Sequence, residues 1–222
     1  SAASAPASSG RSEVQVRGEE VLTPGWYADP MPHDRSGSEA ERPIRRGARA
    51  PGRLRVAARL SACGTMATMT ITAAADGSAL GNPGPAGWAW YIDEDTWRAG
   101  GWPHGTNNMG ELKAVLDLLE STAEDADQHL VILCDSQYVI NSVTKWMPGW
   151  KRKGWRKKDG KPVMNVELLQ AIDRALAGRS VEFEWVKGHS GHAMNEAADK
   201  RANAAATAYS RNQDPQIGPG YR

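Results

Sequence analysis

The chain has 222 residues, a length that suits one ordinary domain or one domain with a long terminal segment. Its 27 basic and 26 acidic side chains give a formal net charge of +1, so any affinity for nucleic acid has to come from local basic clusters and not from a general excess. No apolar stretch approaches the roughly 18 residues of a membrane span, and Cys63 and Cys134 lack the spacing of a zinc site. We therefore expect free thiols, no membrane partner and a cytoplasmic location.

The first 65 residues are rich in Ala, Ser, Gly, Pro and Arg and show no sustained periodicity. Such a segment buries too little apolar surface to offset the entropy of ordering it, so we expect residues 1–65 to be disordered. Seven arginines between Arg42 and Arg59 are open to three interpretations: a transit peptide, a nucleic-acid-binding tail or translated upstream sequence. Met66 and Met69 are candidates for the natural start.

After Met66 the sequence shows patterns typical of strands and helices. In chain order, alternating or short apolar runs and helical spacing predict strands over 69–75, 87–92 and 96–102, a helix over 108–121, a strand over 129–134, helices over 136–143 and 166–176, a strand over 181–185 and a helix over 194–208. This order predicts an α/β fold with a mixed five-stranded sheet flanked by helices. We expect the domain to span residues 66–208 and residues 209–222 to form a flexible tail.

Four acidic residues stand at predicted strand ends or on helices next to a strand: Asp76, Glu111, Asp135 and Asp199. The predicted topology allows them to converge at one end of the sheet. Converging carboxylates repel one another unless cations neutralise them, and hard oxygen ligands suit Mg²⁺ or Mn²⁺. A natural use is a two-metal site for phosphodiester chemistry. Taken singly, an Asp after a strand is more often a turn or capping residue.

The segments around these acids carry a stronger signal. Asp76 opens DGSALGNPGPAG, Glu111 lies in TNNMGEL, Asp135 opens DSQYV, and WVKGHSGH is followed by NEAAD, which ends at Asp199. These segments closely resemble, in order, the motifs of type 1 ribonuclease H, and the resemblance runs from about Met69 to Ala206. It implies a ribonuclease H-like fold and a hydrolase that cuts the RNA strand of an RNA/DNA hybrid duplex, leaving 5′-phosphate and 3′-hydroxyl ends.

The resemblance also assigns catalytic roles. It makes the four acids the ligands of two Mg²⁺ ions, with Mn²⁺ as an alternative. It makes His189 the residue that helps to deprotonate water or release product, a role that suits a His on a Gly-flanked loop, although a lone loop His is more often a surface residue. Glu196, three residues before Asp199 on the same helix face, is interpreted as an acid that tunes one metal without binding it.

Selection of RNA requires contacts with the 2′-hydroxyl, which short polar side chains can reach in an A-like minor groove. Asn82, Asn108 and Gln137 are such side chains, and each stands beside one of the acids. The resemblance places them at the minor groove, with Thr106 and Asn107 near a phosphate of the DNA strand. Without the motif, an Asn in a Gly-rich loop is equally often a turn residue.

Residues 145–161 contain eight basic residues and a single acid, interleaved with tryptophans. This segment resembles the basic handle insertion of some bacterial type 1 enzymes, and we call it the handle. Clustered cations attract phosphates, and Trp packs either as local core or against a sugar, whereas a charge run is otherwise only a solvated surface. The handle residues assigned to nucleic-acid binding are Lys151, Arg152, Lys153, Trp155, Arg156, Lys157 and Lys158.

Three positions depart from the family pattern. Met109 stands where a basic residue is common, Gly110 where a larger apolar residue is usual, and Arg201 where an apolar residue is expected. These departures put in doubt one phosphate contact and the rigidity of the first helical turn, because Gly costs about 1 kcal/mol against Ala in a helix. None of them removes a catalytic group.

Two other functions compete with this hypothesis. A hybrid-binding module without catalysis would need a broken set of acids, and the four acids are intact. A DNA nuclease or integrase on the same fold would lack the Asn and Gln set, and that set is present. The sequence therefore favours a monomeric endoribonuclease that acts on RNA primers and R-loops.

Overall fold

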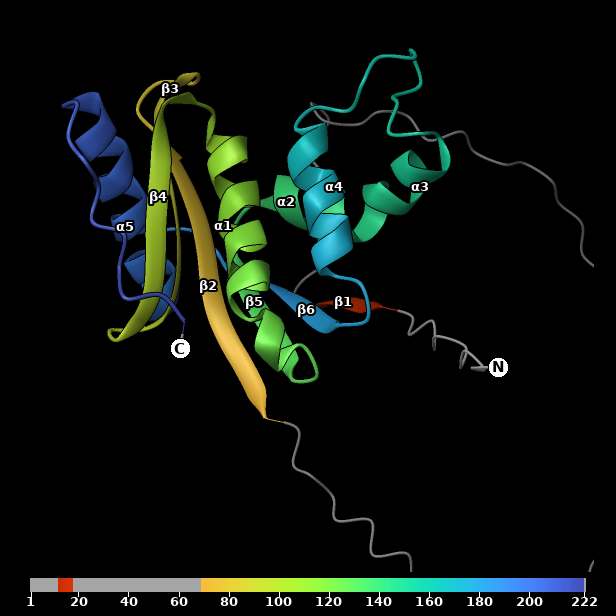
Figure 1. The fold of residues 1–222 in the computed structure, drawn as a ribbon, viewed down its shortest axis with the longest axis horizontal. Helices are drawn as coiled ribbons and strands as arrows, with labels where there is room; N and C mark the ends of the chain where they lie inside the picture. The colour runs from red at the N-terminus through yellow and green to blue at the C-terminus, as the bar shows by residue number, and fades with distance from the viewer. Residues whose placement is uncertain (1–11, 18–68, 222) are drawn as a thin grey trace, which may run out of the picture. The chain divides into compact units, whose positions relative to one another are not determined.

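The computed structural model describes residues 12–17 and 69–221, which belong to one compact unit. Their centre is a mixed sheet with the strand order β1-β6-β5-β2-β3-β4 (Figure 1). The prediction of disorder for residues 1–65 lies outside the described residues, apart from residues 12–17. Within the described part of the chain, no helix is long and apolar enough to cross a membrane.

The strands follow the predicted order, and four of these five strands are longer than predicted. Strands β2, β3 and β4 form an antiparallel meander, and β5 and β6 continue the sheet from β2 in parallel. Their bounds are β2 (Thr70–Ala79), β3 (Gly84–Asp93), β4 (Thr96–Gly105), β5 (His129–Cys134) and β6 (Ser180–Trp185). The predicted α/β class and the mixed sheet are therefore confirmed.

In the described part of the chain, five α-helices connect and cover these strands. They are α1 (Asn107–Ser121), α2 (Gln137–Asn141), α3 (Met147–Arg152), α4 (Val166–Ala175) and α5 (Ala193–Ser210). A 3₁₀ turn follows α1 over Ala123–Asp125, and a π-helical stretch over Ser142–Trp146 joins α2 to α3. The helix predicted over 136–143 is therefore the start of a longer, irregular helical segment.

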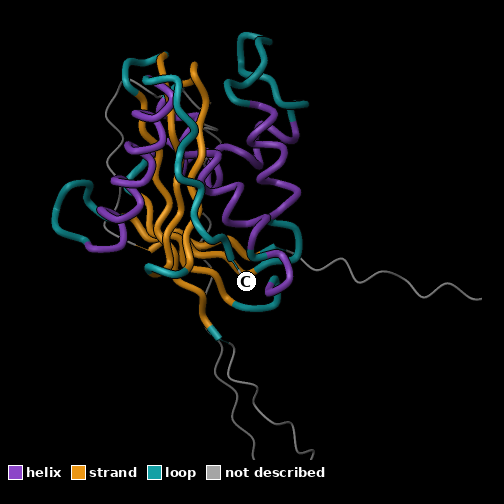
Figure 2. Tube along the Cα trace, turned by 60° about the vertical axis from the view of Figure 1, so that its left-hand side comes forward, coloured by secondary structure: helices purple, strands orange, loops and turns teal. Residues whose placement is uncertain are grey.

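The helices lie on both faces of the sheet, with α5 separated from α1 and α4 (Figures 1 and 2). Because side chains alternate between the two faces of a strand, each face has its own core. The larger core joins the strands to α1, α2 and α4, and includes Trp90, Leu112, Leu119, Ile132, Leu169, Ile172 and Phe183. On the face covered by α5, Ala198 packs against Ala74, Val131 and Leu133, and Ala202 packs with Ala89, Trp97 and Ala99.

The sheet has six strands, one more than predicted, because β1 (Glu13–Arg17) pairs in parallel with β6. Val14 packs against the larger core, the backbone N–H of Glu13 donates to the carbonyl of Arg179 at 3.1 Å, and Arg17 Nε lies 2.8 Å from Glu182 Oε1. The prediction of no ordered element before residue 66 is therefore wrong for these residues. Composition could not reveal β1, since its stability comes from pairing with a strand far along the chain.

The prediction for the C-terminal segment also needs correction, because residues 211–221 form hydrogen bonds with the rest of the domain. The N–H of Ala99 donates to the carbonyl of Ile217, and the N–H of Gly220 donates to the carbonyl of Trp97, both at 3.0 Å. Tyr221 packs against the larger core, and its hydroxyl donates to Asp125 Oδ2 at 2.7 Å. The prediction of a flexible tail over 209–222 is therefore wrong for the described part, which lies against the edge strand β4.

Candidate active site

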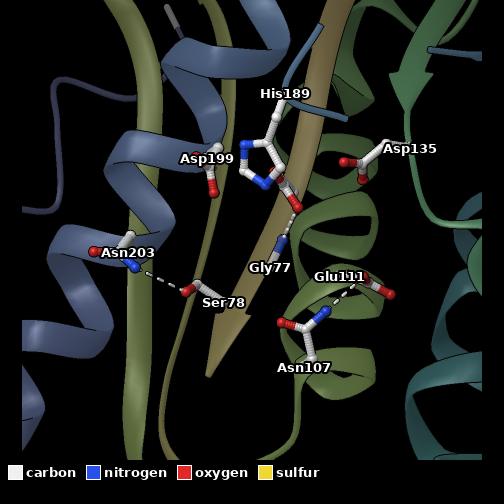
Figure 3. A pocket seen from close by; sticks show the side chains of 9 residues that line it. Gly77, Ser78, Asn107, Glu111, Asp135, His189, Asp199 and Asn203 are labelled. Carbon is white, nitrogen blue, oxygen red and sulfur yellow. Dashed lines mark hydrogen bonds between the residues drawn. The ribbon is translucent and has the colours of Figure 1, made fainter. Parts of the chain in front are cut away.

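The four acids converge on one pocket. Asp76 lies in β2, Glu111 in the first turns of α1, Asp135 directly after β5 and Asp199 in α5. A cavity of about 360 Å³ is lined by these four residues and by Gly77, Ser78, Asn107, His189 and Asn203 (Figure 3). The sequence therefore identified the acids that meet, while Ser78 and Asn203 were not predicted.

Close contact between α1 and β2 brings Glu111 beside Asp76. A β-carbon on Gly77 would lie 2.2 Å from the backbone N of Glu111, and one on Gly110 would lie 3.1 Å from the Cα of Gly77. Only glycine leaves room for this approach. The sequence alone suggested that Gly110 makes the first turn of α1 less rigid. The structure shows instead that glycine is required at this position.

Burial and mutual repulsion disfavour the charged forms of these acids. Burial raises the pKa of Asp76 to about 8, with further increases from Asp135, Asp199 and Glu111. Burial also raises the pKa of Glu111 to about 7, to which Asp135 contributes, and it raises the pKa of Asp135. Ionisation of all four acids therefore requires positive charge that the pocket's own protein groups do not supply.

Both oxygens of the Glu111 carboxylate accept a hydrogen bond. Asn107 Nδ2 donates to Oε1 at 2.7 Å (Figure 3), and Ser136 Oγ donates to Oε2 at 2.5 Å. Asn107, predicted near a phosphate, is therefore bonded to an acid in this conformation. Thr106 caps α1 by accepting from the N–H of Met109 at 3.3 Å, and Asn82 Oδ1 accepts from the N–H of Asn107 at 3.4 Å.

Asp135 is held by groups from β6, α5 and the loop between them. Trp185 Nε1 donates to the backbone carbonyl of Asp135 at 3.2 Å, and buried Asn195 donates to its carboxylate. A β-carbon on Gly188 would lie 2.5 Å from Asp135 Oδ2, so a larger residue there would displace the Asp135 carboxylate. Asn195 was missed by sequence reasoning, although it lies in the NEAAD segment.

His189 follows Gly188 on this exposed loop, with a left-handed backbone at φ 53°. Figure 3 shows its ring between Asp199 and Asp135, and its charge favours the ionised form of Asp135. Glu196 does not line the pocket. Its Oε1 accepts from the N–H of Gly191 at 3.0 Å, so it fastens the loop that carries His189.

Comparison with known proteins gives the family. The sequence profile of the family described as RNase H matches residues 68–207, well over half of the chain. The chain belongs to the ribonuclease H family.

Relatives of this family agree with the type 1 assignment and with a hydrolase. Ribonuclease H of Tropheryma whipplei (strain Twist) is 51% identical over 156 residues, which are 70% of this chain and 96% of that protein. Ribonuclease HI of Streptomyces coelicolor is 49% identical over 141 residues, 60% of each chain. The solved structure of LC9-RNase H1, described as a type 1 RNase H with the type 2 active-site motif, has a TM-score of 0.56 and 28% identity, over 69% of this chain and 76% of that one. This chain is a ribonuclease H, and residues 1–67 lie outside the profile match.

The donor set of this ribonuclease H pocket fits divalent cations. It offers carboxylate oxygens, which are the ligands of Mg²⁺ and Mn²⁺, and bound cations would stabilise the ionised forms that burial disfavours. Among residues 12–17 and 69–221, no three Asp, Glu, His or Cys side chains are arranged to hold one ion in the described conformation. The donors of the site thus fit divalent ions in chemistry and charge.

The remaining predicted contacts do not line the pocket. Half-buried Asn108 and Gln137 stand at the starts of α1 and α2. In the handle, Arg152, Lys153 and Lys158 are exposed, whereas Lys151 pairs with Asp173 at 2.8 Å and Arg156 donates to the carbonyl of Gly160 at 2.9 Å.

The handle tryptophans build a local core. The rings of Trp146 and Trp150 lie 5.7 Å apart, and Tyr138 meets Trp146 edge-on at 6.4 Å. Trp155 packs against the larger core, so part of its surface is not available to a substrate.

Among the three positions that depart from the family pattern, Arg201 has a clear structural role. It stacks on the rings of Tyr91 and Trp97, each at 4.6 Å, and pairs with Glu94 at 2.9 Å. A cation between two aromatic faces replaces the expected apolar residue.

Proposed function

We propose that this ribonuclease H is a Mg²⁺-dependent endonuclease that hydrolyses the RNA strand of RNA/DNA hybrids and leaves 5′-phosphate and 3′-hydroxyl ends. The convergence of Asp76, Glu111, Asp135 and Asp199 with His189 in one polar pocket is the observation that carries the proposal. RNA primers and R-loops are the expected substrates, and the enzyme is expected to act as a monomer.

Each group has a part in this reaction. The four carboxylates would hold two divalent ions, which when bound would supply activation of the attacking water and neutralisation of charge at the leaving 3′-oxygen. His189 lies on the exposed side of the pocket beside Asp135. There its imidazole can accept a proton from the attacking water or give one to the departing product. Asn107 and Ser136 orient Glu111, and Asn195 orients Asp135.

Substrate choice divides between two regions. We assign Asn82, Asn108 and Gln137 to the minor groove, where the 2′-hydroxyl distinguishes RNA from DNA. The exposed cations of the handle attract phosphates regardless of sequence. The first region therefore selects the strand to be cut, and the second contributes affinity.

Cleavage of matched duplexes tests the proposal. The RNA/DNA hybrid, double-stranded DNA and double-stranded RNA of one sequence, each labelled on one strand, are incubated with the full chain in Mg²⁺ or in excess chelator. Only the RNA strand of the hybrid should be cut, and only with Mg²⁺. Cleavage in chelator, or equal cleavage of double-stranded DNA, would contradict the proposal.

A further inference from the structure

Ser136 connects two of the acids, although it was not among the predicted site residues. It follows Asp135 in the chain, and its hydroxyl donates to Glu111, which belongs to another element, α1. Ser136 and Glu111 are both buried. This single hydrogen bond therefore joins the β5 end that carries Asp135 to the helix that carries Glu111.

The hydroxyl of Ser136 is held in one orientation by a second hydrogen bond. It accepts from the backbone N–H of Val139 at 3.3 Å and so caps α2. A hydroxyl has one proton, and because its lone pair serves the helix end, that proton is directed at Glu111 Oε2. Capping and donation thus fix the side chain together.

The arrangement leaves Glu111 able to bind an ion. Asn107 and Ser136 take one lone pair on each carboxylate oxygen, and each oxygen keeps another. Asn107 moves with Glu111, because both belong to α1, whereas Ser136 holds the carboxylate from outside that helix. Ser136 is therefore the group that sets where the Glu111 carboxylate lies relative to Asp135.

We propose that Ser136 is a positioning residue of the divalent-ion site, which aligns Glu111 with Asp135 before an ion binds. The inference rests on the proposed function, because it assigns both acids to that site. Hydrogen bonds to ligating carboxylates orient them, and losing such a partner commonly weakens metal affinity by about 10-fold to 100-fold.

Three variants of the full chain separate this role from helix capping. Ser136→Gly removes the donor but keeps a residue that is acceptable at an N-cap. Ser136→Thr keeps both the hydroxyl and the cap. Ser142→Ala is the matched control, since Ser142 is also a buried serine of this helical segment and its hydroxyl has no hydrogen-bond partner among the described residues.

Mn²⁺ binding measured by calorimetry without nucleic acid is the primary readout, and kcat and KM for the hybrid are the second. Ser136→Gly should weaken Mn²⁺ binding about 10-fold and lower kcat, with KM unchanged. Ser136→Thr and Ser142→Ala should match the unmodified chain. Thermal melting confirms that each variant is folded.

Wild-type Mn²⁺ affinity and kcat in Ser136→Gly would overturn the inference, as would equal losses in Ser136→Gly and Ser136→Thr. Equal losses in Ser142→Ala would also overturn it, because the effect would then be general to buried serines. Failure of the unmodified chain to bind Mn²⁺ or to cleave the hybrid would instead overturn the proposed function.

Discussion

Gly110 of α1 lies directly against Gly87 of β3: a β-carbon on Gly110 would be 2.5 Å from the carbonyl oxygen of Gly87. The obstacle is backbone, which cannot move aside as the end of a flexible side chain can. Since Glu111 is the next residue, the distance between helix and sheet also sets the position of a pocket carboxylate.

Gly110→Ala should therefore lower the free energy of unfolding by about 1 to 3 kcal/mol, as overpacking of a tight contact does, and should reduce kcat. Urea denaturation measures the first effect. Gly149→Ala is the control, because Gly149 lies in helix α3 with nothing within 4 Å of an added β-carbon. It should be neutral or stabilising by up to about 1 kcal/mol. Equal stability of the two variants would show that α1 and β3 are less closely packed than described.

His189→Ala should slow cleavage by about 100-fold to 10,000-fold, the usual effect of losing a general acid or base. His104→Ala serves as the control, because His104 is exposed on β4 and does not line the pocket. Single-turnover rates at saturating hybrid separate chemistry from product release. If His189→Ala has the wild-type rate in both single and multiple turnovers, His189 has no part in proton transfer or product release.

The handle should contribute affinity without selectivity. Replacing exposed or half-exposed Arg152, Lys153, Lys157 and Lys158 with Gln should weaken hybrid binding, and each lost phosphate contact should reduce the slope of log affinity against log salt by about 0.9. The preference for cutting RNA over DNA should survive. Arg211→Gln, in an exposed residue after α5, should leave the slope unchanged. Parallel salt curves for the handle variant and the wild type would mean that the handle is only a solvated surface.

Strand β1 should be lost when its buried contact is made polar. Val14 packs against the larger core, while Val16 on the same strand is 45% exposed. Val14→Asp should therefore release β1 and increase amide exchange in the peptide covering β6. Val16→Asp lowers the β-propensity of the strand by the same amount but should change this exchange only slightly. Unchanged exchange of β6 in Val14→Asp would show that β1 does not pair with it in solution.

The sequence predicted the strands and helices that leave a local pattern of apolar residues. The strand over 129–134 is a continuous apolar run with predicted and observed ends in agreement, and the helix over 166–176 ends one residue earlier in the structure. Such runs are unambiguous because burial on a sheet or along one helical stripe leaves a regular trace in the sequence. The acids of the pocket could be found because their flanking motifs are long.

Features that depend on contacts between distant segments could not be predicted. Strand β1 is stabilised by pairing with β6, and the C-terminal segment is stabilised by hydrogen bonds to the edge strand β4, both far away along the chain. The partners of Glu111 and Asp135 depend on how α1, β5 and α5 pack, so Ser136 and Asn195 carry no local mark of their roles. Ser136 could have been predicted as a helix cap, but not as a donor to Glu111.

Cleavage and binding by Asp135→Asn test the central claim most directly, because an amide keeps the shape of the side chain and removes the charge that holds the ions. The full-length variant is compared with wild type and with Asp127→Asn, which changes an exposed acid outside the pocket. We predict that Asp135→Asn binds the RNA/DNA hybrid as wild type does but cleaves it at less than about a hundredth of the wild-type rate, while Asp127→Asn cleaves normally. Cleavage by Asp135→Asn above that level would contradict the assignment of the four acids as the catalytic site.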